Sequence, residues 1–185
     1  MSKSKWDRES EGFVEITMVD RHGRKRRQYV YRGEYYIHAV GKLTGVWSKL
    51  AVLLITLCSA ALLWISVSRS TTINSVFFAG GISFLAAIPM LFVLIGTLRF
   101  LMMKDRMQVQ QYRECRNSLF WGGIIAAVLL LVSVAGGIYW VCAVKTASAL
   151  DTTVIVLNAL VFVLQAVSAW LHRKKHYQVQ WEETE

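Results

Sequence analysis

The stretch Leu50–Val67, LAVLLITLCSAALLWISV, contains no charged residue. Its 18 residues, wound into an α-helix, extend about 27 Å, which approaches the roughly 30 Å of hydrocarbon in a bilayer. The stretch therefore predicts a transmembrane helix.

Three further stretches match it in length and composition, at about 73–98, 118–144 and 150–171. None of them carries a charge in its central part. The chain of 185 residues is 55% hydrophobic and 18% charged, whereas a soluble domain is about 25% charged. Four apolar helices in so short a chain leave too little polar surface to cover a soluble core. The pattern predicts a mainly α membrane protein with a four-helix transmembrane bundle over 50–171.

The basic residues predict the orientation of this bundle. Lys and Arg number 11 in 1–49, five in 99–117 and three in 172–185, against only Arg69 and Lys145 in the two remaining loops. Short cytoplasmic loops carry an excess of Lys and Arg. We therefore expect a multi-pass protein of the cell membrane with both termini and the loop 99–117 in the cytoplasm. The net charge of +9 then requires no nucleic-acid partner.

Tryptophans mark the expected membrane interfaces, where amphipathic rings concentrate. Trp47 and Trp64 bracket the first span, Trp121 and Trp140 bracket the third, and Trp170 marks the cytoplasmic end of the fourth.

The cytoplasmic N-terminal segment, 1–33, has the pattern of a β-hairpin. Residues 13–20 (FVEITMVD) alternate in polarity, 28–32 (QYVYR) is rich in β-forming residues, and the connection between them contains Gly23. Two stretches containing QVQ, at 107–110 and 177–181, alternate in the same way. Either they join the hairpin in a small sheet beneath the bundle, or they continue their spans as helices.

Residues 34–49 have the spacing of an amphipathic helix lying in the membrane interface. One face of that helix would carry six residues: Tyr36, Ile37, Val40, Leu43, Thr44 and Trp47. The remaining segment, 172–185, is expected to be a cytoplasmic tail.

Few polar side chains fall inside the spans. Asn158 and Gln165 are seven residues apart and share a helix face, and Ser83 lies in the second span. We expect interhelical hydrogen bonds from these three, because buried amides in lipid need partners. The alternative is a polar lining for a solute path. Pro89 is expected to kink the second span.

Known catalytic motifs are absent from the sequence, and we expect no catalytic residues, no cofactor and no metal. His172 and His176 are spaced to share a metal ion, but the sequence HRKKH surrounds them with cations that would repel it. The run Arg24, Lys25, Arg26 and Arg27, at the tip of the predicted hairpin, is expected to contact anionic lipid headgroups or a partner protein.

These features favour a non-enzymatic accessory or assembly subunit of a larger membrane complex, which binds other membrane subunits or itself. The alternative is a small oligomeric channel or transporter for a neutral or small solute. It is favoured by a faint repeat, in which KDRMQVQ at 104–110 resembles KKHYQVQ at 174–180. A membrane-embedded enzyme acting on lipid is the third possibility, and the sequence supports it least.

Overall fold

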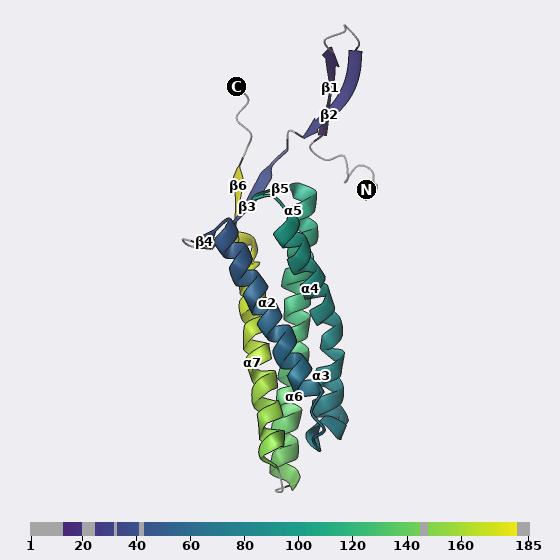
Figure 1. Cartoon of the computed structure of the whole chain (residues 1–185), viewed down its shortest axis with the longest axis vertical. Coiled ribbons are helices and arrows are strands. Elements are labelled where there is room, and N and C mark those ends of the chain that lie inside the picture. The colour runs from purple at the N-terminus through teal and green to yellow at the C-terminus, as the bar shows by residue number, and fades with distance from the viewer. Residues whose placement is uncertain (1–12, 20–24, 32, 41–42, 145–147, 181–185) are drawn as a thin grey trace.

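Four long apolar helical segments dominate the structure, a computed structural model that describes residues 13–19, 25–31, 33–40, 43–144 and 148–180. Each segment is long and apolar enough to cross a membrane: Val46–Val67, Phe77–Met102, Val109–Val144 and Ala149–Leu171. The expected mainly helical fold is confirmed at this level. The segments run together as one elongated bundle (Figure 1).

Two of the segments contain breaks in the α-helical hydrogen-bonding pattern. The first and fourth are single helices, α2 (Val46–Val67) and α7 (Ala149–Leu171). The second consists of a π-helical turn (Phe77–Gly81), α3 (Ile82–Leu85) and α4 (Ala87–Met102). The third consists of α5 (Val109–Arg116), a second π-helical turn (Asn117–Trp121) and α6 (Gly122–Val144). Short 3-10 turns lie at Ile73–Ser75 and Lys174–His176.

The break in the second segment lies at Ala86, which separates α3 from α4. Pro89 follows in the first turn of α4. A proline cannot donate a hydrogen bond to the preceding turn and clashes with its carbonyl. The interruption therefore lies where a proline-induced kink is expected.

The bundle has an apolar exterior, and its interior combines apolar clusters with buried polar side chains. Large side chains such as Leu54 and Phe92 are each 60% exposed, while the side chains of Thr56, Ser83 and Gln165 are fully buried. A soluble helical bundle has the opposite arrangement. This distribution is consistent with a multi-pass membrane protein.

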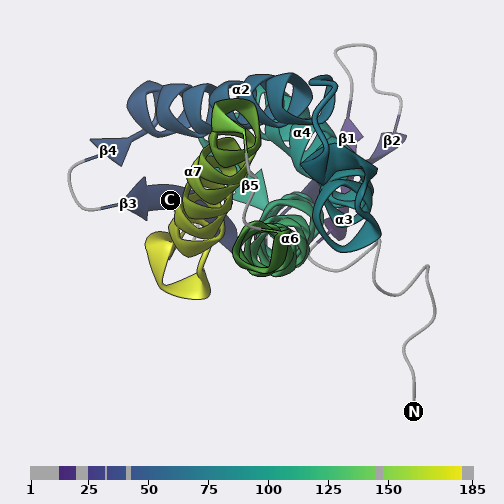
Figure 2. The same cartoon turned by 90° about the horizontal axis from the view of Figure 1, so that it is seen from below.

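Small residues allow the helices to approach closely. Gly122 faces α4, where an added Cβ would lie 3.0 Å from Val93 Cγ2. Gly123 faces α7, where an added Cβ would lie 3.3 Å from the Cβ of Ala169. Helix α6 thus packs against both neighbours, and α2 crosses the bundle obliquely (Figure 2).

A small antiparallel sheet covers one end of the bundle, called the sheet end below (Figure 1). Its central strand, β3 (Tyr35–Val40), pairs with three short strands: β4 (Leu43–Thr44), β5 (Arg106–Gln108) and β6 (Tyr177–Gln180). The opposite end, with the connections between α2 and α3 and between α6 and α7, is called the loop end.

The prediction of an amphipathic helix over 34–49 is wrong. Residues 35–40 form β3 instead, and α2 begins at Val46 after Gly45, whose φ of 56° lies in the left-handed region. Tyr, Ile and Val favour strands, and residues distant in sequence supply the pairing partners. Tyr36 lies opposite Met107 on β5 and Val179 on β6.

The expected β-hairpin is present as β1 (Phe13–Val19) and β2 (Lys25–Tyr31), paired from Phe13↔Tyr31 to Val19↔Lys25. It forms a separate two-stranded ribbon (Figure 1). The QVQ stretches pair with β3, so the expectation that they join the hairpin is wrong. The first stretch is strand only to Gln108, and α5 begins at Val109. The predicted turn at Gly23 lies outside the described residues.

Candidate functional site

A line of buried polar residues runs along one face of α7. It contains Asp151, Asn158, Gln165 and, one residue beyond the helix, His172, each at most 2% exposed. Seven residues correspond to about two helical turns, or about 10 Å along the axis. The residues at this spacing therefore face the same side, and the line extends from the loop end to the sheet end. We call it the polar face of α7.

Asn158 joins the four helical segments through hydroxyl groups. Its Nδ2 donates to Ser83 Oγ at 2.8 Å and to Ser133 Oγ at 3.2 Å. Its Oδ1 accepts from Ser66 Oγ at 2.7 Å. The structure thus places Asn158 and Ser83, two residues selected from the sequence, in one interhelical network. Ser66 did not stand out in the sequence, because a single serine in an apolar helix carries little signal.

Asp151 holds the loop end together. Its carboxylate accepts hydrogen bonds from the backbone N–H groups of Ile73 and Ser148, both at 3.1 Å, and from Ser148 Oγ at 2.8 Å. Ser148 Oγ in turn accepts from Asp151 N, which completes a capping box at the start of α7. This cap was not predicted from the sequence, although the spacing Ser148-x-x-Asp151 would have indicated it. The carboxylate links α7 to the α2–α3 connection through Ile73.

Gln165 differs from Asn158, although it occupies the equivalent position two turns further along. Its side chain is fully buried, and neither Oε1 nor Nε2 has a hydrogen-bond partner in the described part of the chain. The hydroxyl of Ser168, on the next turn, is also without a partner there. An unpaired buried polar group costs about 1–3 kcal/mol. Near the sheet end, the polar face therefore has fewer hydrogen bonds to its buried polar groups than it has near the loop end.

Two stacked imidazoles connect the sheet to the bundle. The His38 ring on β3 lies 5.1 Å from the His172 ring, and the Phe100 ring on α4 meets both edgewise. His38 Nε2 donates to the Leu171 carbonyl at 3.0 Å, and His172 Nδ1 shares a 2.7 Å hydrogen bond with the Tyr177 hydroxyl. The residues come from four different elements, so their proximity left no pattern in the sequence.

Burial controls the ionisation of these histidines. It lowers the pKa of His38 below 6.5, and it holds the pKa of His172 well below 6.5 with a smaller contribution from the neighbouring imidazoles. His176 does not join the pair but lies against the Trp170 ring, at 4.7 Å. No group of three or more His, Cys, Asp or Glu that could hold a metal ion occurs among the described residues.

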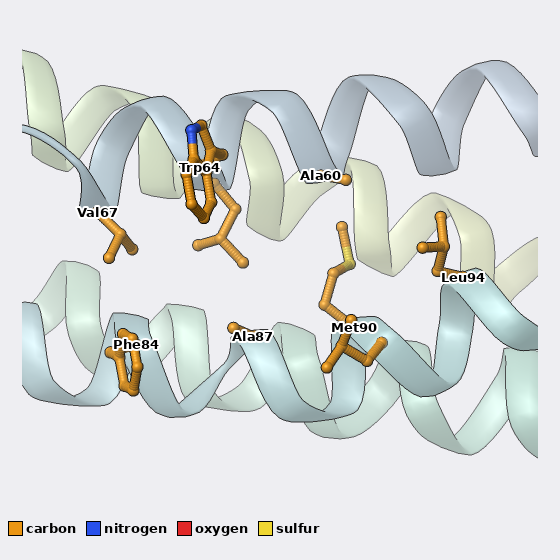
Figure 3. A pocket seen from close by; sticks show the side chains of 9 residues that line it. Ala60, Trp64, Val67, Phe84, Ala87, Met90 and Leu94 are labelled. Atoms are coloured by element: carbon orange, nitrogen blue, oxygen red, sulfur yellow. The ribbon is translucent and has the colours of Figure 1, made fainter.

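An apolar groove of about 310 Å³ lies between α2 and the α3–α4 segment. Thr56 Oγ1 and Thr97 Oγ1 are 3.0 Å apart and join the two walls toward the sheet end. Closer to the loop end the walls carry only apolar side chains, which face one another across a gap (Figure 3). The residues that line it are Ala60, Leu63, Trp64, Val67, Phe84, Ala87, Met90, Leu91 and Leu94. We call it the α2–α4 groove.

The basic residues of the hairpin lie away from these sites. Lys25, Arg26 and Arg27 begin β2, and Arg24 lies outside the described residues. Arg27 Nε pairs with Glu15 Oε1 across the hairpin at 3.3 Å, and both side chains are exposed.

The expected interface tryptophans are mostly on the surface of the bundle. Exposed rings belong to Trp47, Trp64, Trp121 and Trp170. Trp140 is half-buried and packs against the cluster around Ile73 at the loop end. Trp64 also borders the α2–α4 groove. No protein-family model, curated protein or solved structure matches the chain.

Proposed function

We propose that the chain is a non-enzymatic, four-span integral membrane protein that acts as an accessory or assembly subunit of a larger membrane complex. In this proposal the sheet end lies in the cytoplasm, and the α2–α4 groove receives a transmembrane helix of a partner subunit. The observation that carries it is the groove itself, an entirely apolar recess between two spans.

The lining of the groove supports a helix as its occupant. Ala60 and Ala87 lie on opposite walls (Figure 3), and small side chains let helix backbones approach closely. Small residues elsewhere in the bundle, such as Gly122 and Gly123, already face helices of this chain. Ala60 and Ala87 line an open recess instead, which leaves them available to a further helix.

The hairpin supports a second contact outside the membrane. Its basic residues begin β2, and the described strands stand beyond the sheet end (Figure 1). Either an acidic surface of a partner subunit or anionic lipid headgroups would complement the charges of Lys25, Arg26 and Arg27.

Two adjacent alanines provide the test. Ala60 lines the groove, whereas Ala61 is exposed on the same helix and does not line it. Ala60→Phe should fill the groove and reduce the amount of each membrane protein that co-purifies in mild detergent. Ala61→Phe, which adds the same volume beside it, should not. Equal co-purification with both variants would remove the groove from the proposed interface.

The channel alternative depends on the polar face of α7, where Gln165 and Ser168 are buried without hydrogen-bond partners among the residues that the structure describes. The amide of Asn158, however, is already hydrogen-bonded on both its nitrogen and its oxygen, which favours a structural role. A measurement of solute flux through purified protein in sealed vesicles discriminates between a channel and an accessory subunit. Solute flux that is lost in Gln165→Leu while the protein remains folded would support the channel over the subunit.

A further inference from the structure

A second groove, of about 610 Å³, opens at the sheet end between the end of α4, strand β5 and Tyr35 of β3. Three cationic residues line it, Arg99, Lys104 and Arg106, together with the polar side chains of Gln108 and Gln111. No carboxylate lines it in the part of the chain that the structure describes. We call it the basic groove.

The nearest acidic residues leave most of this charge uncompensated. Asp105 pairs with Lys49 at 3.0 Å. Glu114 reaches Arg99 only at 3.7 Å, and both side chains are more than half exposed, so that pair contributes little. Lys104 and Arg106 are exposed and form no ion pair with any described residue. The groove therefore holds about two positive charges that an anionic ligand could neutralise.

The segment that carries these charges is held in place. Lys49 Nζ, at the start of α2, donates to the Met103 carbonyl at 2.7 Å and also holds Asp105. Strand β5 pairs with β3 at Tyr35, Tyr36 and Ile37. The connection between α4 and β5 is thus fixed on both sides of Lys104, and binding a ligand requires little further ordering of the backbone.

The position of the groove indicates the kind of anion. It lies where the apolar helix α4 ends, and Met102, which lines it, is 80% exposed. Ile95 and Leu98 are exposed at three- and four-residue spacing before Met102, and they form one apolar stripe that leads from the groove along α4. Cationic groups at the end of a span with an apolar stripe beneath them match a phosphate headgroup and its acyl chain.

From this arrangement we infer that the basic groove binds an anionic phospholipid, with the headgroup phosphate between Lys104 and Arg106 and an acyl chain along Ile95 and Leu98. Two uncompensated cations favour a headgroup with two negative charges, such as a phosphomonoester, over one with a single charge. This site does not depend on a partner protein, and it is separate from the α2–α4 groove.

Binding to the purified full-length protein in a nonionic detergent tests the inference, with short-chain phosphatidic acid as the probe. The double variant Lys104→Gln/Arg106→Gln should bind about thirtyfold more weakly, given about 1 kcal/mol for each basic residue near a headgroup. Arg173→Gln/Lys174→Gln is the matched control, because it removes one Arg and one Lys that are also exposed at the sheet end. The control should retain its affinity within about twofold.

The comparison ligands separate lipid from other sources of the same charge. Phosphatidylserine, with one net negative charge, should bind more weakly than phosphatidic acid, and phosphatidylcholine weakest of all. Inorganic phosphate at the same concentration should not compete. An equal loss of affinity in the two double variants, or competition by inorganic phosphate, would overturn the inference.

Discussion

Asn158 Nδ2 lies 2.8 Å from Ser83 Oγ, and this hydrogen bond joins α7 to α3 in the interior of the bundle. The same amide holds Ser133 on α6 and Ser66 on α2. Each helical segment therefore contributes one polar group to a network that excludes alternative rotations of the helices. Because Asn158 is the only member that contacts the other three, it is the residue on which the network depends.

We expect Asn158→Leu to lower the stability of the detergent-solubilised protein. Interhelical hydrogen bonds in membranes are worth roughly 0.6–2 kcal/mol each, and the substitution removes three while leaving hydroxyl groups buried. Ser168→Ala is the control, since its hydroxyl has no partner among the described residues. Thermal unfolding should show a clear decrease for the first variant and little change for the second. Equal melting of the two variants would contradict the network.

Gln165→Leu should have the opposite effect. Leu has nearly the volume of Gln and leaves no polar atom unpaired, whereas both polar atoms of the Gln165 side chain are buried without a partner in the described part of the chain. Removing that unsatisfied group should raise stability by about 1–3 kcal/mol. The measurement is the same thermal unfolding. A decrease comparable to that of Asn158→Leu would show that Gln165 has a partner in the folded protein.

The helical part of the fold could be predicted because each span carries its signal locally. A charge-free run such as Leu50–Val67 needs no information about its neighbours. The segment 34–49 could not be predicted in this way, because Tyr36 and Val40 fit a helix stripe as well as a strand. The partners that decide between the two, Met107 and Val179, are distant in sequence.

The candidate site residues also divide into those that the local sequence reveals and those that only the tertiary fold brings together. Asn158 and Gln165 could be selected because an amide in an apolar helix is conspicuous. Their seven-residue spacing extends to Asp151 and His172, which lie at the ends of the span and could therefore be mistaken for ordinary boundary residues. The pairing of His38 with His172 depends entirely on the tertiary fold, since 134 positions separate them.

The proposed orientation predicts which end of the bundle is reached from outside the cell. Ser70, at the loop end, and Gln110, at the sheet end, are both exposed. After replacement of Cys58, Cys115 and Cys142 by Ala, a membrane-impermeant thiol reagent should label a Ser70→Cys variant in intact cells. It should label Gln110→Cys only after permeabilisation. The reverse pattern would invert the topology and place the basic groove on the outer leaflet.

The stacked histidines predict that stability depends on pH. In the folded state burial lowers the pKa of His38 below 6.5 and holds that of His172 well below it. In the unfolded state both return to about 6.5. Below that pH the unfolded chain binds more protons than the folded one, so stability decreases as the pH falls. The stability that the two neutral histidines contribute is fully present above about pH 6.5.

The groups around the pair do not reverse this sign. Tyr177 and His176 lie beside the pair, and burial keeps the Tyr177 hydroxyl protonated by raising its pKa well above 10.0. Lys49, Lys104 and Asp105 line a small cavity with His38. Protonated His176 and the cations Arg173 and Lys175 would only disfavour charge on the buried imidazoles. The Asp105 carboxylate on the His38 side is paired with Lys49 at 3.0 Å, and Lys104 adds a further cation there, so this group of charges does not favour a charged imidazole.

Unfolding of the purified protein should therefore become easier between pH 7.5 and pH 5, with a slope of up to about 1.4 kcal/mol per pH unit for each histidine. The variant His38→Gln/His172→Gln should flatten the profile in this window, because an amide does not titrate and the amide introduced on β3 would retain a donor for the Leu171 carbonyl. His176→Gln is the comparison, since its ring is half-buried and lies outside the stacked pair, and its pKa is lowered less than that of His172. It should retain most of the slope. A wild-type protein equally stable at both pH values would show that the two imidazoles are not buried in their neutral form.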